Sequence, residues 1–197
     1  MRTVLLVCTG NTCRSPMAEA MLRELAGQSN LSIEIRSAGV GAMDGVPVSP
    51  HAAEVLRRKK LPVPGPSKAL TGEHVAWADL ILAMTSSHKR AIIQHFPDAA
   101  DKTYTLKEYA YLDDELSQDL LEAERLYTEW QIRRATGGRL DDSDRARLEE
   151  LQKRLPDFDI ADPYGGPLDL YEQSAAEIRE ALKRVIGRLG GAGKAET

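Results

Sequence analysis

The segment Cys8-Thr-Gly-Asn-Thr-Cys-Arg-Ser15 places an arginine six positions after a thiol. It follows a short apolar run, Thr3 to Cys8, and precedes a proline suited to the first turn of a helix. In a loop at a helix N-terminus, backbone N–H groups can point inward while the helix dipole adds positive potential. Gly10 is expected to relieve steric limits where the backbone closes around an oxyanion, and Arg14 supplies a two-pronged guanidinium. This spacing predicts a phosphate-binding loop.

The same positive field favours the ionised form of the Cys8 side chain, and the thiolate is the reactive form of cysteine. A cysteine at the end of a buried strand is more often a small core residue, so only the surrounding loop supports a chemical role. With that loop present, Cys8 is predicted to act as a nucleophile at neutral pH.

These residues resemble the signature of the low-molecular-weight protein phosphatases, which is Cys, five residues, Arg and Ser near the N-terminus. A second segment, Asp162-Pro163-Tyr164, looks like that family's Asp-Pro loop, although Asp-Pro alone more often opens a turn. The resemblance implies that Cys8 attacks phosphorus while Arg14 and the loop amides hold the phosphoryl oxygens. It also implies that Asp162 acts as general acid and then general base, with no metal or cofactor.

Other loop residues take supporting roles by the same resemblance. Asn11 and Ser15 would hold the loop in shape, with Ser15 also bonding the Cys8 sulfur and Ser37 supporting Asn11. Cys13 matches a second cysteine found in part of the family, where it forms a disulfide with the nucleophile, provided that the geometry of a tight loop allows it. The predicted phosphate- and substrate-binding set is Thr9, Gly10, Asn11, Thr12, Cys13, Ser15 and Tyr164.

Thr12 brings the loop nearer to the bacterial protein arginine phosphatases, because tyrosine-specific members tend to carry an aliphatic residue there. A threonine hydroxyl can accept a hydrogen bond from the guanidinium of phosphoarginine, whereas isoleucine cannot. Under this interpretation Asp162 also orients the guanidinium, Tyr164 stacks on it, and Gly165-Gly166 leaves the rim open. The alternative is that Thr12 is only a loop residue whose hydroxyl forms a hydrogen bond with its own backbone.

Three other functions remain as alternatives. A phosphotyrosine phosphatase is the nearest rival, because it uses a similar loop. An arsenate reductase of this type needs a further cysteine to relay the disulfide, and the chain has only Cys8 and Cys13. A non-catalytic phosphate-binding module would be expected to lack Cys8 or Asp162, and both are present. The four histidines show no ligand spacing paired with cysteines, so no metal site is predicted.

The elements that must position these residues alternate between strand and helix. Apolar runs predict strands at 3–8, 79–84 and, more weakly, 103–106, and an alternating pattern predicts one at 31–36, closed by a Ser37-Ala38-Gly39 turn. Ser15 is expected to cap the helix that follows the loop and runs to about Ala26. Further helices are expected at 51–60, 73–77, 86–95 and 168–189. The pattern predicts a three-layer α/β/α fold around a four-stranded parallel sheet in the order 2-1-3-4.

Residues 113–156 break that rhythm, because leucines and aromatic residues recur there at helical spacing on both sides of Gly137-Gly138. They predict an inserted helical hairpin in a single phosphatase domain, 1–189, followed by a flexible tail, 190–197. We expect the hairpin to form a local hydrophobic core. The alternative is that it biases the position of the acid loop or recognises the protein substrate.

Composition sets the remaining expectations for this chain of 197 residues, which has 42% hydrophobic residues and a net charge of -4. That balance gives no reason to expect nucleic acid or membrane partners, so the expected partners are phosphorylated proteins. The longest apolar run near the N-terminus is too short for a signal peptide, which predicts a cytoplasmic protein. The chain is expected to act as a monomer.

Overall fold

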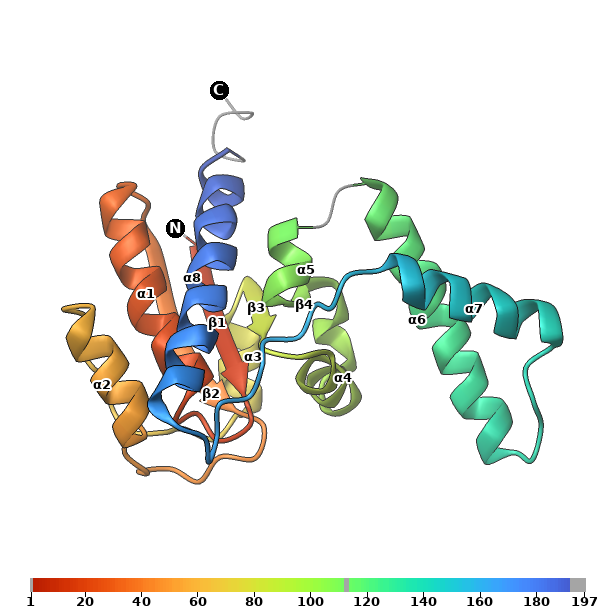
Figure 1. Cartoon of the computed structure of the whole chain (residues 1–197), viewed down its shortest axis with the longest axis horizontal. Helices are drawn as coiled ribbons and strands as arrows, with labels where there is room; N and C mark the ends of the chain where they lie inside the picture. The colour runs from red at the N-terminus through yellow and green to blue at the C-terminus, as the bar shows by residue number, and fades with distance from the viewer. Residues whose placement is uncertain (1, 112–113, 192–197) are drawn as a thin grey trace. The chain divides into compact units, whose positions relative to one another are not determined.

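Four parallel strands form the centre of the fold (Figure 1). The computed structural model describes residues 2–111 and 114–191 of the chain. The sheet has the order β2-β1-β3-β4, and all neighbouring strands run parallel. This confirms the predicted α/β architecture and strand order. The strands are β1 (Arg2–Cys8), β2 (Ile33–Gly39), β3 (Leu80–Ala83) and β4 (Thr103–Thr105).

Alternation along β1 explains why its sequence is apolar from Val4 onward. Val4 and Leu6 belong to one hydrophobic core, and Leu5 and Val7 belong to a second core on the opposite face. All four side chains are fully buried. Because helices cover both faces of the sheet, the strand is buried from Val4 to Cys8, and only its first two residues, Arg2 and Thr3, contact water.

The helices form the two outer layers (Figure 1). Residues of α1 (Arg14–Gln28), α2 (Pro50–Arg58), α5 (Leu106–Tyr111) and α8 (Leu168–Gly191) share the first core. Residues of α3 (Gly72–Trp77) and α4 (Ser86–His95) share the second core, which also includes Ala99 of the short 3-10 helix Pro97–Lys102.

Several predicted boundaries were wrong. The Ser37-Ala38-Gly39 segment is not a turn but the end of β2, where the Gly39 N–H donates to the Lys68 carbonyl at 2.9 Å. Ser15 does not cap α1, because the helix begins at Arg14 and its N-cap residue, Cys13, makes no side-chain cap bond. The same helix continues through Gly27. The final helix includes residues 190 and 191, and the rest of the predicted tail, 192–197, lies outside the described residues.

The chain divides into two compact units, one of residues 1–111 with 158–197 and one of residues 112–157. The second unit contains α6 (Asp114–Ala135) and α7 (Asp142–Arg154), the helices of the predicted hairpin. It has a small core of its own, and Arg147 and Glu122 form an ion pair at 2.8 Å that joins its two helices. The buried residues of that core are Ala123, Leu126, Leu140, Leu148 and Leu151.

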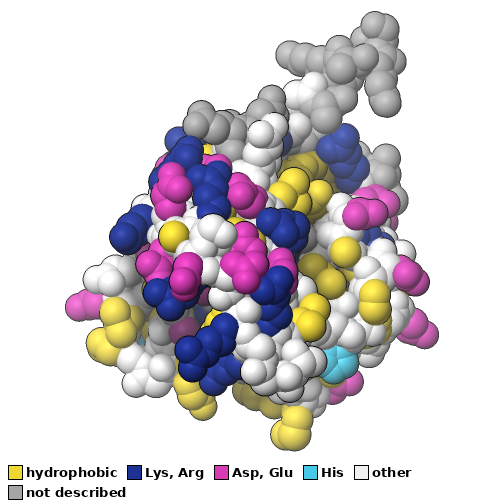
Figure 2. All heavy atoms as spheres, turned by 90° about the vertical axis from the view of Figure 1, so that its right-hand side faces the viewer, with side chains coloured by type: hydrophobic (Ala, Val, Ile, Leu, Met, Phe, Trp, Pro, Cys, Tyr) yellow, Lys and Arg dark blue, Asp and Glu magenta, His cyan; other side chains and the backbone are white. Residues whose placement is uncertain are grey.

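The surface carries charges of both signs. Figure 2 shows basic and acidic side chains intermingled on the face that it presents. In the described parts of the chain, no helix is long and apolar enough to cross a bilayer, and no cluster of histidine, cysteine and carboxylate side chains is arranged to hold a metal ion.

Candidate active site

The loop between β1 and α1 carries the thiol and the arginine at its two ends. Cys8 ends β1, Arg14 begins α1, and both side chains are buried. The backbone closes the loop through Asn11, which takes a left-handed conformation with φ of 53°. Gly10, in contrast, has no positive φ, and a Cβ placed there would meet only the Thr12 Oγ1 atom, at 3.5 Å. The steric role expected of Gly10 therefore belongs to Asn11.

Hydrogen bonds hold the sulfur and the loop in one arrangement. The Cys8 Sγ lies 3.0 Å from the Ser15 Oγ and accepts the Asn11 N–H at 3.3 Å. The Asn11 side-chain amide donates to the hydroxyls of Ser15 and Ser37, both at 2.9 Å. The carbonyl end of the same side chain accepts the Lys68 N–H at 2.8 Å. The sulfur thus contacts one backbone N–H and one hydroxyl, and the Asn11 amide network keeps both in place.

Gly39 at the end of β2 lies directly behind this loop. A Cβ on Gly39 would collide with the Thr9 carbonyl oxygen and stand 2.9 Å from the Asn11 nitrogen. Both of these are backbone atoms, so neither can move aside as a flexible side chain would. Sequence reasoning took Gly39 for a turn residue, whereas its lack of a side chain allows the loop to approach the sheet.

Arg14 connects the loop to the acid segment. Its Nη1 donates to the Ile160 carbonyl at 3.1 Å, and its Nη2 donates to the Asp162 Oδ2 at 2.8 Å. The guanidinium is 4% exposed and the carboxylate is 52% exposed, so the pair is open on the acid side only. The Arg14 Nε, buried as well, has no hydrogen-bond partner among the described residues and is free to bind an oxyanion.

A pocket of about 410 Å³ brings most of the predicted site residues together. Asp162 also lines it, and its Oδ1 accepts the Tyr164 N–H at 3.1 Å. Asn11 and Ser15 stand behind the loop and do not line this pocket. The predicted residues that line it are Cys8, Thr9, Gly10, Thr12, Cys13, Arg14, Asp162 and Tyr164.

Cys13 lines the same pocket, and both thiols are free. Its Sγ lies 3.4 Å from the Ser49 Oγ and 3.5 Å from the Tyr171 hydroxyl. Burial raises the pKa of Tyr171 to about 12, so this hydroxyl stays protonated at neutral pH. The disulfide between Cys8 and Cys13 remains a prediction from the family resemblance.

His88 is a site residue that sequence reasoning missed. Its Nε2 lies 2.7 Å from the Thr9 Oγ1, and its Nδ1 lies 2.9 Å from the Thr85 Oγ1. Burial, aided by the Arg14 charge and opposed by Asp162 and Asp159, lowers the pKa of His88 to about 4. The imidazole is therefore neutral at pH 7 and ties the first residue after Cys8 to α4. No spacing signal could have revealed this contact, because its partners are 79 residues apart.

Fold and site together define a class of protein. A parallel sheet delivers a thiol into a loop at a helix N-terminus, an arginine with a free donor lies in the same loop, and a carboxylate bonded to that arginine lines the same pocket. This combination of a thiol, an arginine and a carboxylate is typical of a cysteine-dependent phosphatase.

Comparison with known proteins identifies the family. Residues 3–154 match the model of the low molecular weight phosphotyrosine protein phosphatases, and the chain belongs to that family. A protein-arginine-phosphatase of Geobacillus stearothermophilus is 36% identical over 94% of this chain and 95% of its own length. The solved YwlE arginine phosphatase of that organism gives a TM-score of 0.73 at 33% identity and covers all of this chain and 98% of its own. The tyrosine phosphatase PtpB of Staphylococcus haemolyticus is 30% identical over 94% of this chain and 96% of its own length.

Proposed function

We propose that this phosphatase removes phosphate from phosphoarginine on proteins. The observation that carries the proposal is the pocket in which the Thr12 hydroxyl and the Asp162 carboxylate face the same space as Cys8. Both groups can accept hydrogen bonds, and a guanidinium offers N–H donors beside the bond that breaks, whereas a phenol ester offers none. The 36% identity to a protein-arginine-phosphatase supports the same substrate.

In the first step of the proposed reaction, the Cys8 thiolate attacks phosphorus and the P–N bond breaks. The incoming phosphoryl group takes the place of the Asp162 carboxylate on the Arg14 guanidinium, where the free Nε adds a donor. Asp162, in its protonated form, gives its proton to the departing guanidine nitrogen. The products of this step are a phosphocysteine and an unmodified arginine side chain.

In the second step, water attacks the phosphocysteine. The Asp162 carboxylate takes a proton from that water, the S–P bond breaks, and inorganic phosphate leaves with the Cys8 thiolate restored. Arg14 and the inward-facing loop amides stabilise the equatorial oxygens in both transition states. Asn11 and Ser15 act on the chemistry only by holding the sulfur and the loop.

The acid loop favours a planar, extended leaving group. Tyr164 is 79% exposed at the rim, where its ring can stack on a guanidinium. Gly165 has a positive φ of 75°, which side chains rarely adopt, and a Cβ on Gly166 would stand 3.2 Å from the Pro163 carbonyl oxygen and require the end of the Leu170 side chain to move. The rim therefore lacks a clasp for a phenyl ring.

Thr12→Ile and Thr12→Ser, assayed side by side, test the proposed specificity. Peptides of one sequence that carry phosphoarginine or phosphotyrosine serve as substrates, and the ratio of their kcat/KM values is the measurement. Loss of a hydrogen bond to a charged group predicts that Thr12→Ile lowers this ratio by about tenfold to hundredfold. Thr12→Ser keeps the hydroxyl and is expected to keep the ratio.

The rival is a phosphotyrosine phosphatase, which the 30% identity to PtpB favours. It predicts that the wild-type protein prefers the phosphotyrosine peptide. An equal ratio in the wild type and Thr12→Ile would discard Thr12 as the residue that selects the substrate.

A further inference from the structure

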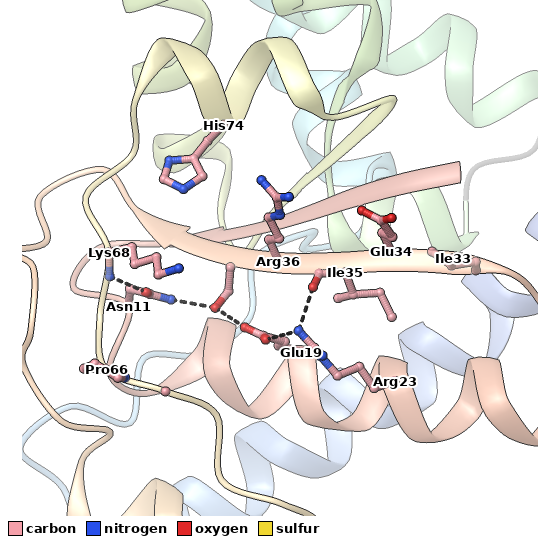
Figure 3. A pocket seen from close by; sticks show the side chains of 12 residues that line it. Asn11, Glu19, Arg23, Ile33, Glu34, Ile35, Arg36, Pro66, Lys68 and His74 are labelled. Atoms are coloured by element: carbon pink, nitrogen blue, oxygen red, sulfur yellow. Dashed lines mark hydrogen bonds and ion pairs between the residues drawn. The ribbon is translucent and has the colours of Figure 1, made fainter. Parts of the chain in front are cut away.

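A second pocket, of about 600 Å³, lies along the edge of β2 (Figure 3). None of its lining residues lines the pocket around Cys8. Asn11 nevertheless belongs to both environments, because its backbone N–H holds the Cys8 sulfur while its side chain reaches this second pocket. The pocket is therefore separate from the active site but one residue away from it.

Three nitrogen-bearing side chains gather at one end of the pocket. Figure 3 shows Arg36 and His74 on one side of β2 and Lys68 next to Asn11, and all three line the pocket. The Arg36 guanidinium stacks on Trp77, at 4.0 Å from the ring centroid. In the parts of the chain that the structure describes, neither Arg36 nor Lys68 is ion-paired to a carboxylate within 4.0 Å. Two positive charges thus line one cavity without a carboxylate in direct contact with either.

The charges of Arg36 and Lys68 affect the pKa of His74. Its Nδ1 accepts the Thr71 N–H at 3.3 Å, which leaves the proton of the neutral ring on Nε2 as a donor. Burial lowers the pKa of His74, and the charges of Lys68 and Arg36 lower it further against the opposing carboxylates of Glu73 and Asp44. An anion between these groups would reverse that effect.

The carboxylates of the pocket do not cancel the charge. The Glu19 carboxylate already accepts hydrogen bonds from the Arg23 guanidinium at 2.6 Å and from the Ser37 hydroxyl at 2.5 Å. These two neighbours therefore compensate its charge. Glu34 lies further along β2, away from Lys68 and Asn11 (Figure 3).

The exposed edge of β2 adds a backbone donor. Gly39 points its N–H away from β1 to the Lys68 carbonyl, and Ile35 points its carbonyl the same way to Arg23. Strand alternation therefore directs the N–H of Ser37 to the same edge, which forms a wall of this pocket.

We propose that this pocket binds a compact oxyanion of the phosphate type, held by Arg36, Lys68 and His74 at the edge of β2. An anion at this place also bears on the active-site loop. The residue that would grip it, Lys68, donates its backbone N–H to the Asn11 side chain that holds the loop. Occupancy of the pocket thus stabilises the contact behind the nucleophile.

Inorganic phosphate is the probe for the first experiment, and Arg14→Ala, which loses the active-site clamp, is the background. The proposal predicts saturable phosphate binding by calorimetry, with a rise in the pKa of His74 observed by NMR. Adding Arg36→Gln and Lys68→Gln abolishes both signals, whereas Lys59→Gln, at an exposed lysine after α2, leaves them intact. In the wild-type protein two classes of phosphate site are expected, and only one remains after the same two substitutions.

The occupant could be free phosphate or a second phosphoryl group on the protein substrate. Free phosphate predicts that low phosphate concentrations alter turnover of para-nitrophenyl phosphate in the wild type and not in Lys68→Gln. A substrate phosphoryl group predicts that Lys68→Gln raises KM for a multiply phosphorylated protein by about tenfold and leaves KM for the small ester unchanged. The proposal is overturned if His74 does not respond to phosphate, or if it responds equally when both cations have been replaced.

Discussion

Two loops meet at the pocket around Cys8, and they differ in how firmly the protein holds them. The phosphate loop, residues 8–15, is mostly buried, and its sulfur, amide and hydroxyl groups bond to one another and to β2. The acid loop, residues 162–166, is mostly exposed, and its carboxylate rests on Arg14 through a single ion pair at 2.8 Å.

The difference follows from what each loop meets. Every substrate presents the same phosphoryl group, so a fixed arrangement of donors stabilises the transition state without reorganisation. In the proposed reaction, the leaving group and the attacking water arrive at the acid loop in succession, and Asp162 has to release Arg14 before it can serve either. A network as dense as that around Asn11 would oppose that movement.

Cys8→Ser gives the largest expected effect and tests the phosphate loop alone. A serine hydroxyl is a much weaker nucleophile than a thiolate, so kcat is expected to fall by about 10⁴- to 10⁶-fold. Phosphate affinity is expected to survive, because Arg14 and the loop remain. Cys13→Ser, in the same loop, is the control and keeps turnover. Measurable turnover in the Cys8 variant, once contamination is excluded, would remove Cys8 as the nucleophile.

Asp162→Asn is the matching test of the acid loop. Loss of the proton donor is expected to lower kcat by about 10²- to 10⁴-fold, with the smallest loss for leaving groups that need no proton. Removing the carboxylate from Arg14 also frees the guanidinium, so phosphate binding by calorimetry is expected to become tighter. Asp169→Asn, in the first turn of α8, is the control. Weaker phosphate binding in the Asp162 variant would contradict the exchange of partners at Arg14.

Sequence patterns predicted the sheet because a strand that is buried on both faces, such as β1, contains a continuous apolar run. They failed where tertiary contacts overrode local preference. Serine is a preferred residue type at helix N-caps, but the Ser15 hydroxyl contacts the Cys8 sulfur and the Asn11 amide instead. The short helix α5 follows β4 directly, whereas the sequence predicted only a weak strand at 103–106 and no helix after it.

The candidate site was predictable where its residues are adjacent in sequence, as from Cys8 to Ser15, or carry a recognisable pair such as Asp162-Pro163. The supports behind it were not. Glycine is common in turns, and only the fold shows that backbone atoms of Thr9 and Asn11 occupy the space that a side chain of Gly39 would need.

Gly39→Ala tests whether the phosphate loop depends on its close approach to β2. The added methyl group forces the backbone of the phosphate loop outward, and displacement of catalytic groups by about 1 Å costs on the order of tenfold to hundredfold in kcat. Gly41→Ala is the matched control, because its Cβ would make only ordinary contact, 3.8 Å from Thr9. Assays of kcat together with thermal unfolding separate the two variants. Equal activity in both would show that the loop tolerates the displacement.

His88→Gln has the smallest expected effect, because His88 supports the phosphate loop without lining the pocket. Loss of one hydrogen bond to Thr9 predicts a reduction of kcat by about two- to tenfold. Stability gives a second measurement. The folded pKa of His88, about 4, lies below the unfolded value near 6.5, so the unfolded state takes up a proton first as the pH falls.

The wild-type protein is therefore expected to lose stability between about pH 6.5 and pH 4, a loss that the neutral glutamine removes. Each unit of pKa difference corresponds to about 1.4 kcal/mol, and each kcal/mol to about 2–4 °C in Tm for a chain of this size. The Tm difference between pH 7 and pH 4.5 should then be several degrees smaller in His88→Gln than in the wild type or in His95→Gln, whose imidazole is exposed. An identical pH dependence in all three proteins would show that His88 gains its proton in the folded state as readily as in the unfolded chain. The rigidity of the phosphate loop would then not depend on a neutral imidazole.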